Sequence, residues 1–254
     1  MGYATARYLS RQGYTVYAGS RTPDKIEPNE HLHPILLDLR DPKSIEESLK
    51  QIEGVDILIN NAGYGLVSTV EDVTEAEMLA QFDVNVFGLL RVTRAVIPLM
   101  REQNGGVIIN ISSFLGKIGL PLFTLYNASK YAIEGITDSL RYELADFNIR
   151  VHSVMPGFFS TNFARENLQI NEATFNEFSP YRHLVSTLAP TVVEQINEGN
   201  NPEAVARLIE EIINTPNALA RYSAGDKAAK FIPMRRELSD EDFERRVREY
   251  YGIG

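Results

Sequence analysis

The sequence predicts an α/β fold in which a doubly wound parallel sheet forms a single domain over residues 1–254, with its first strand missing. Three observations lead to this prediction. Short apolar runs alternate along the chain with longer segments of helical period. A length of 254 residues suits one α/β domain. The composition, with 44% hydrophobic and 23% charged residues, is typical of a globular protein rather than a disordered or fibrous one.

Six short runs rich in β-branched and apolar residues are the predicted strands. Several are apolar almost throughout, which is typical of strands covered by helices on both faces. The predicted strands are residues 14–18, 35–39, 55–59, 107–111, 150–154 and, with a weaker pattern, 219–223.

The segments between these strands have a helical period. Gly13 is a suitable residue to end the first of them, and Pro202 with Glu203 suits the first turn of the last. Right-handed connections between parallel strands place such helices on both faces of the sheet. The predicted helices are residues 2–12, 42–53, 74–103, 124–147 and 202–214.

The start of the chain departs from the usual order of such folds. A doubly wound sheet that binds nucleotides opens with a strand and a glycine-rich turn, whereas this chain opens with the helix 2–12. Only Gly2 could be the last glycine of such a turn. Two interpretations remain open: a start codon assigned too far downstream, which the intact remainder of the site favours, or a protein that truly lacks the turn.

Charge and composition exclude several function classes. The formal net charge of −9 argues against nucleic acid or an anionic membrane as the main partner. The chain has no cysteine, and its four histidines form no ligand set, so no metal site is expected. It has no apolar run of ~20 residues that could span a membrane and no signal-peptide pattern. We therefore expect a cytoplasmic protein.

Polar residues with catalytic potential follow the predicted strands. Tyr126 and Lys130 are four residues apart and share one face of a helix. Such a pair is weak evidence alone. Three of the predicted strands, however, are followed by further residues of this kind: Ser113 after one strand, the segment 60–63 (Asn-Asn-Ala-Gly) after another, and Pro156 with Gly157 after a third. Ligands of parallel sheets bind at the carboxyl ends of the strands, so these groups are expected to meet there.

With these motifs, and with Asn85 in the segment 83–88, the chain resembles the short-chain dehydrogenase/reductase family, whose fold is Rossmann-like. The resemblance is close from Gly2 to Thr161 and looser beyond, where residues 201–254 form an extension similar to that of steroid- and retinol-dehydrogenase-like members. It implies that Asn85, Ser113, Tyr126 and Lys130 form a catalytic tetrad.

The chemistry of these residues suits carbonyl reduction. A free tyrosine has a pKa of ~10, whereas an acid/base that works near neutrality needs ~7. An ammonium ~4 Å away can supply most of that difference, so Lys130 is expected to lower the pKa of Tyr126. Ser113 would donate to the substrate oxygen. By resemblance, Asn85 would hold a water that relays protons to Lys130; read alone, it is a polar residue that bonds locally within a helix.

The resemblance also implies a nicotinamide cofactor bound along the ends of the strands. Asp38 would bond the adenine, although it could equally cap the helix that begins near Pro42. The expected cofactor-binding residues are Gly2, Ser20, Arg21, Asp38, Leu39, Asn61, Ala62, Gly63, Tyr126, Lys130, Pro156, Gly157, Phe159 and Thr161.

Cofactor choice depends on the end of the strand 14–18. An acidic residue there would favour NAD(H), but the chain offers Ser20 and Arg21. A guanidinium could compensate the charge of a 2′-phosphate. NADP(H) is therefore the preferred cofactor, and NAD(H) is the other candidate. The alternative interpretation of Arg21 is an arginine of a solvated loop that does not contact the cofactor.

The expected substrate is a small-molecule ketone or secondary alcohol of apolar character, with a steroid, a retinoid and another lipid-like compound as the candidates. An apolar pocket is expected from Leu115, Ile118, Leu120 and Phe123, and a lid from residues 158–200, unless these residues simply form core. A homodimer or homotetramer through the long helices 74–103 and 124–147 is expected by resemblance. The alternative function is a catalytically silent nucleotide sensor or scaffold of the same fold.

Overall fold

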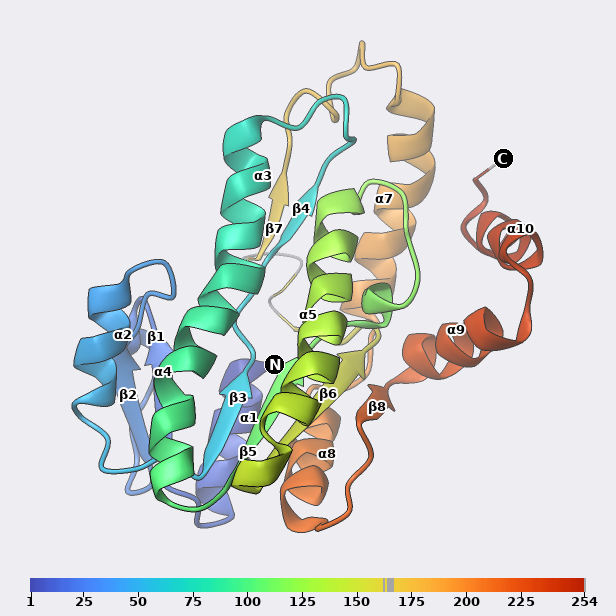
Figure 1. Ribbon diagram of the computed structural model, residues 1–254. Coiled ribbons are helices and arrows are strands. Elements are labelled where there is room, and N and C mark those ends of the chain that lie inside the picture. The colour runs from blue at the N-terminus through green and yellow to red at the C-terminus, as the bar shows by residue number, and fades with distance from the viewer. Residues whose placement is uncertain (162, 164–166, 254) are drawn as a thin grey trace.

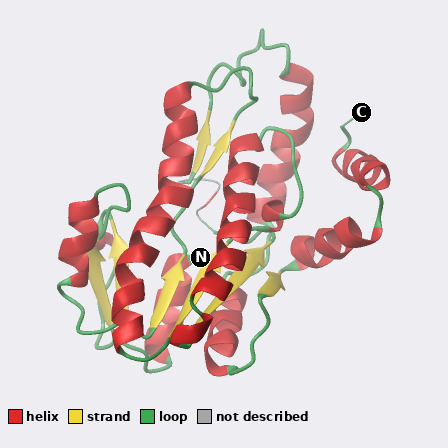
Figure 2. Cartoon of the chain, viewed as in Figure 1, coloured by secondary structure: helices red, strands yellow, loops and turns green. Residues whose placement is uncertain are grey.

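The central element of the protein is a four-stranded parallel sheet covered by helices on both faces (Figures 1 and 2). The computed structural model describes residues 1–161, 163 and 167–253. The strand order is β3-β5-β6-β8, and every neighbouring pair is parallel. The strands are β3 (Ile57–Asn60), β5 (Gly106–Ile111), β6 (Ile149–Pro156) and β8 (Arg221–Ala224). The α/β prediction is confirmed.

A second parallel sheet lies beside the first and contains only β1 (Val16–Ser20) and β2 (Leu32–Leu36). Within the described ranges, no strand joins β1 to β3, so the sheet is broken between them. The sequence prediction that the first strand is missing agrees with this break.

Alternate residues of β5 explain why the sheet has two apolar faces, because successive strand side chains point in opposite directions. Val107, Ile109 and Ile111 pack in a cluster with residues of α1 (Gly2–Arg11) and α8 (Glu203–Asn214). Ile108, between them, packs in another cluster with residues of α2 (Pro42–Leu49), α4 (Leu89–Glu102) and α5 (Thr124–Glu143). The near-continuous apolar run of β5 is thus a strand buried on both sides.

The predicted helix 74–103 is present, but its middle is not α-helical. It begins with α3 (Glu75–Phe82), passes through a π-helical turn, η2 (Asp83–Gly88), and continues as α4. Thr74 starts it with a capping box, in which its hydroxyl accepts from Glu77 N and the Glu77 carboxylate accepts from Thr74 N. π-Turns inside α-helices are frequent at functional sites, and this one carries Asn85.

A third group of elements lies beyond the carboxyl ends of the strands (Figure 1). The short parallel pair β4 (Gly65–Val67) and β7 (Leu168–Ile170) and the helices α7 (Arg182–Asn197), α9 (Asp226–Glu237) and α10 (Asp240–Tyr251) were not predicted as separate elements. Residues of these helices form an apolar cluster with Tyr126 and the segment 114–123. No helix within the described residues is long and apolar enough to cross a membrane.

The predicted strand 35–39 was placed three residues too late. β2 spans Leu32–Leu36 and includes Pro34. An edge strand tolerates this proline, and among the described residues β1 is the only strand that pairs with β2. Leu37 and Leu39 lie just beyond the strand and pack against the cluster of α2 and α4. Because both leucines are partly buried against helices, apolar residues continue past the end of β2, and this apolar run has the pattern of a strand.

Replacement of Thr74 by alanine tests the capping box. The Thr74→Ala variant is expected to lose about 1 kcal/mol of unfolding free energy, because the backbone N–H of Glu77 loses its acceptor. Urea denaturation measures this loss. Thr22 precedes the 3₁₀ turn η1 (Pro23–Lys25) without a side-chain capping bond, so Thr22→Ala is the matched control. Equal losses in both variants would contradict the assignment.

Candidate active site

Tyr126 and Lys130 lie one turn apart on α5, buried where the carboxyl end of β5 meets this helix. Tyr126 is 9% exposed and Lys130 4%. The Lys130 ammonium donates to Ile111 O at 3.0 Å, at the last residue of β5, and lies 5.6 Å from the centre of the Tyr126 ring. The predicted pair is therefore brought together on one helix face.

Ser113 joins this pair from the end of β5. It is buried and precedes the 3₁₀ turn η3 (Phe114–Gly116), where its hydroxyl accepts from Leu115 N at 3.1 Å. The Ser113 side chain also forms a hydrogen bond with the Tyr126 phenol, which acts to lower the tyrosine pKa. A hydroxyl, a phenol and an ammonium thus share one buried site.

The charge states differ from those that the sequence predicts. Burial raises the pKa of Tyr126 to about 12, because removal from water disfavours the phenolate, and the bond from Ser113 offsets this only in part. Burial also lowers the pKa of Lys130 to about 8. The expectation that the pKa of Tyr126 falls toward neutrality is therefore wrong for this structure, because burial is the largest cause and only Ser113 acts against it.

Asn85 is the fourth residue of the predicted tetrad, and it is 1% exposed. Its amide nitrogen donates to Tyr64 O at 2.9 Å and to Ser129 Oγ at 3.0 Å, and its oxygen accepts from Tyr64 N at 3.1 Å. Ser129 Oγ in turn donates to Tyr126 O. Both amide protons of Asn85 are committed to protein partners, so its side chain holds the turn after β3 against α5. A role in a water relay remains a prediction.

The glycine of the predicted motif 60–63 lies directly over the catalytic cluster. A Cβ atom added to Gly63 would lie 3.1 Å from Asn85 Oδ1 and 3.8 Å from Lys130 Nζ. Because Gly63 has no side chain, the backbone of this turn can approach Asn85 and the ammonium closely. Glycine permits such close backbone approach to a nucleotide, so this turn fits a nicotinamide nucleotide.

Gly2 begins α1 and faces the same turn: a Cβ at Gly2 would lie 2.4 Å from Asn61 Nδ2. Ala62 lies between Asn61 and Gly63 in this turn. The structure therefore brings the predicted residues at the start of α1 and after β3 together.

A second group of predicted residues gathers beyond β1 and β2. Ser20 ends β1, and its hydroxyl accepts from Thr22 N. Asp38 forms an ion pair with Arg40 at 2.6 Å, which lowers the pKa of Asp38 to about 2, and the charge of exposed Arg21 contributes. The alternative that Asp38 caps a helix is wrong, because Asp41 caps α2 and accepts from Lys43 N.

Leu39 lies beside this group, and its carbonyl accepts from Arg91 Nη1 at 3.2 Å. A Cβ at Gly88 would lie 2.8 Å from Leu39 Cβ. Leu39 therefore packs on η2.

The predicted residues after β6 lie near the start of α9. Gly157 N donates to Ala224 O at 2.8 Å, and a Cβ at Gly157 would lie 2.9 Å from Lys227 Cβ. Close packing of α9 therefore accounts for the glycine that follows Pro156. Phe159 is buried in the cluster of β5 and α8, and Thr161 Oγ1 accepts from Phe163 N.

Apolar side chains surround the phenol. The rings of Phe163 and Phe123 lie 6.0 Å and 6.3 Å from that of Tyr126. The four residues predicted to wall a pocket are all buried within this cluster: Leu115, Ile118, Leu120 and Phe123. A groove of about 410 Å³ lies elsewhere, between α2 and α4, and its lining includes none of the catalytic residues.

Sequence reasoning missed three polar residues at the site. Arg40, two residues after Asp38, adds a second guanidinium beside Arg21. Ser129 links Asn85 to the helix of Tyr126. Glu134 is a buried carboxylate one turn after Lys130. The four-residue spacing from Lys130 to Glu134 was the available signal, because it places both on one helix face.

Replacement of Lys130 by methionine tests its burial as a charged group. The pKa of Lys130 in the folded protein lies below the ordinary lysine value of 10.5. The free energy of unfolding of wild type is therefore reduced by the burial of a charge below pH 8, and this reduction disappears as the pH rises toward 10.5. The Lys130→Met variant lacks this dependence. We expect the free energy of unfolding of wild type to increase relative to that of the variant between pH 8 and 10. A difference that stays constant over this range in chemical denaturation would contradict the buried ammonium.

Comparisons with known proteins agree with this geometry. The sequence model of the family described as short chain dehydrogenase matches residues 1–172. The 3-ketodihydrosphingosine reductase of Bacteroides thetaiotaomicron is 33% identical over 257 residues, covering 99% of this chain and 94% of the relative. Retinol dehydrogenase 8 of Bos taurus is 33% identical over 207 residues, covering 78% of this chain and 66% of the relative.

A solved structure gives the same result for the fold. A short-chain dehydrogenase from Streptomyces avermitilis superimposes with a TM-score of 0.81 at 29% identity, covering 99% of this chain and 93% of that one. The matched family model includes β3, β5, β6 and α5, which carry or support Ser113, Tyr126 and Lys130. The chain therefore belongs to the short-chain dehydrogenase family, and it is an oxidoreductase of that family.

Proposed function

We propose that the protein is an NADP(H)-dependent oxidoreductase that interconverts a ketone and a secondary alcohol on an apolar substrate. The observation that carries this proposal is the meeting of the Tyr126 phenol, the Ser113 hydroxyl and the Lys130 ammonium in one buried site. A proton donor, an oxyanion partner and a fixed cation are the groups that carbonyl reduction requires from a protein.

The proposed roles follow from the charge states. At neutral pH a phenol with a pKa near 12 is protonated, so Tyr126 is a proton donor to the developing alkoxide. Ser113 donates a hydrogen bond to the same oxygen. Lys130 remains mostly protonated below its pKa of about 8 and attracts negative charge that forms on the phenol. The site is therefore suited to the direction of reduction, and the reverse reaction returns the proton to Tyr126.

A nicotinamide cofactor supplies or accepts the hydride when it is bound. The residues proposed to hold it are those that the sequence predicts, now extended by Arg40. Gly63 brings the backbone of the turn after β3 close to Lys130, and Gly2 packs against Asn61 of the same turn. The nicotinamide end is proposed to lie toward Pro156, Gly157, Phe159 and Thr161.

The preference for NADP(H) rests on the two guanidinium groups near the end of β1. Arg40 is held by Asp38, and Arg21 is close enough to lower the pKa of the same carboxylate. Both cations would attract a 2′-phosphate. The carboxylate of Asp38 is already paired with Arg40, so it is not a free acceptor for a ribose hydroxyl. The net charge of the chain is −9, which disfavours an additional phosphate, and these two arginines would supply the local positive charge that the 2′-phosphate needs.

The apolar surroundings of Tyr126 support a lipid-like substrate. Phe123 and Phe163 flank its ring, and Leu168, Phe175 and Leu184 of the proposed lid pack against the same cluster. Two relatives are named 3-ketodihydrosphingosine reductase and retinol dehydrogenase 8. The first name gives a keto compound as the substrate, and the second gives an alcohol. The lid is proposed to span residues 158–200; of these, Asn162 and residues 164–166 lie outside the described residues.

Assembly through the long helices is part of the proposal. Exposed apolar side chains lie along η2, α4 and α5, among them Phe87, Leu90, Tyr131 and Tyr142. Burial of such side chains against a second copy would remove apolar surface from water. We propose a homodimer or homotetramer.

The first test replaces Tyr126 by phenylalanine. The Tyr126→Phe variant is expected to lose roughly 10²–10⁴-fold in turnover of a ketone with NADPH, because the proton donor is absent. Its NADPH affinity, measured by calorimetry, is expected to be nearly unchanged. Tyr131→Phe, an exposed tyrosine on the same helix, is the matched control. Full activity of Tyr126→Phe would refute the mechanism.

The second test changes the charge near β1. Arg21→Glu is expected to shift the ratio of kcat/KM values from NADPH toward NADH, because a carboxylate repels a 2′-phosphate and accepts from a ribose hydroxyl. Lys25→Glu makes the same charge change at another exposed position nearby and is the control. If Arg21→Glu leaves the ratio of the wild type, the cofactor argument fails.

A further inference from the structure

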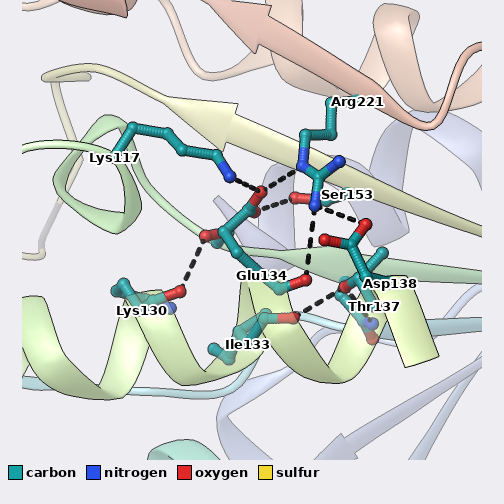
Figure 3. A network of polar contacts seen from close by, with 10 residues as sticks. Lys117, Lys130, Ile133, Glu134, Thr137, Asp138, Ser153 and Arg221 are labelled. Carbon is teal, nitrogen blue, oxygen red and sulfur yellow. Dashed lines mark hydrogen bonds and ion pairs between the residues drawn. The ribbon is translucent and has the colours of Figure 1, made fainter. Parts of the chain in front are cut away.

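Glu134 is a buried carboxylate that the proposed chemistry does not use. It lies on α5 one turn after Lys130 and is 3% exposed. Figure 3 shows its side chain between three partners. Glu134 Oε2 pairs with Arg221 Nε at 2.6 Å and Lys117 Nζ at 3.2 Å, and Oε1 accepts from Ser153 Oγ. A carboxylate this deeply buried requires such partners.

These partners come from three different segments. Lys117 directly follows η3, the turn that begins at Ser113. Ser153 belongs to β6 and Arg221 to β8, where the two residues are paired across the strands. One carboxylate thus connects the helix of Tyr126 and Lys130 to the turn of Ser113 and to two strands of the sheet.

The turn and the helix are in close contact at this point. A Cβ at Gly116 would lie 2.9 Å from Lys130 O and 3.2 Å from Glu134 Cγ. Ser112 Oγ donates to Lys130 O at 3.4 Å. Because the turn and the helix are packed without free space between them, a displacement of the turn that carries Ser113 would also displace the backbone of Lys130.

Glu134 also acts on Lys130 through its charge. Burial lowers the pKa of Lys130, and the negative charge of Glu134 acts in the opposite direction. The other charged groups around this carboxylate are Lys117 from η3, Arg221 from β8 and Asp138 from the next turn of α5, which pairs with Arg221 at 2.6 Å. Ser153 of β6, which is uncharged, donates to Glu134. Asn85 of η2, also uncharged, donates to Ser129, the residue before Lys130.

We propose that Glu134 is a positioning residue for the catalytic pair, because it fixes the turn of Ser113 against the helix of Tyr126 through Lys117. The charge of Glu134, one helical turn from Lys130, also favours the protonated ammonium. This inference rests on the proposed function, in which Ser113, Tyr126 and Lys130 act together. Its two parts, geometric and electrostatic, predict different effects for different variants.

The electrostatic part is tested by Glu134→Gln, which keeps the shape of the side chain and removes the charge. NMR titration of ¹³C-labelled lysine, with Lys130 assigned from Lys130→Met, measures the pKa directly and does not depend on activity. We expect the pKa of Lys130 to fall by about 0.5, since Arg221 and Lys117 partly neutralise the carboxylate. The alkaline limb of the kcat profile is expected to move to lower pH by the same amount. An unchanged pKa of Lys130 would refute this part.

The geometric part is tested by Lys117→Met, which frees the turn of Ser113 and leaves the charge of Glu134 in place. We expect kcat to fall about tenfold with KM nearly unchanged, because the donor is displaced from the reacting oxygen. The pKa of Lys130 is not expected to fall. Lys117→Arg is expected to restore most of the loss, and a wild-type kcat in Lys117→Met would overturn the proposal.

Asp138→Asn is the matched control, because it removes a carboxylate from the same helix and from the same arginine without touching the turn. It is expected to keep the pKa of Lys130 and kcat within twofold of wild type. If Glu134→Gln fails to fold, as circular dichroism would show, the comparison of Lys117→Met with Lys117→Arg decides the proposal. Failure of the proposed function would appear separately, as activity retained in Tyr126→Phe.

Discussion

The burial of an ammonium group and a phenol side by side at the end of a parallel sheet is the constraint on which the site depends. Burial opposes the charge of Lys130 and raises the pKa of Tyr126. A buried ammonium needs an oxygen acceptor, and the carbonyl of Ile111, at the last residue of β5, accepts from it. The carboxylate of Glu134, one turn away, provides the compensating charge. The end of the strand and the helix that crosses it therefore form one electrostatic unit.

Other buried polar groups hold the elements that meet at this unit. Asn110, in the middle of the apolar run of β5, accepts from Asn60 Nδ2 at 2.9 Å and donates to Thr137 Oγ1 at 2.9 Å. These bonds connect β3, β5 and α5 behind the catalytic cluster. The π-turn η2 adds Asn85, whose amide joins Tyr64, in the turn between β3 and β4, to Ser129. Satisfied buried networks of this kind fix one arrangement of the core.

Much of this could be predicted from the sequence, because the strongest patterns are local. The apolar run of β5 and the spacing of Tyr126 and Lys130 gave their positions correctly, and the start of the chain predicted the break in the sheet. The strand 35–39 was misplaced because Leu37 and Leu39 face helices instead of a strand partner. The helix 74–103 was predicted, but its π-turn was not, since nothing in the residues 83–88 marks a change in helical hydrogen bonding.

Properties that depend on distant contacts could not be predicted. The partners of Glu134 lie 17 residues before it, at Lys117, and far beyond it, at Ser153 and Arg221, and no spacing rule joins them. The pKa of Tyr126 was expected to fall, because its attraction to Lys130 was considered without the cost of burial. Cofactor binding by Gly157 stays a prediction, but its close contact with Lys227 of α9 could not be predicted.

The central claim is that Tyr126 exchanges a proton under the influence of a nearby positive charge. Ultraviolet difference titration, comparing wild type with Tyr126→Phe, follows the ionisation of this single phenol. Without cofactor the account predicts a pKa near 12. With saturating NADP⁺, whose nicotinamide ring is positively charged, it predicts a large fall, so that the phenolate signal appears below pH 10. A phenol of Tyr126 that ionises at the same pH with and without NADP⁺ would contradict the account.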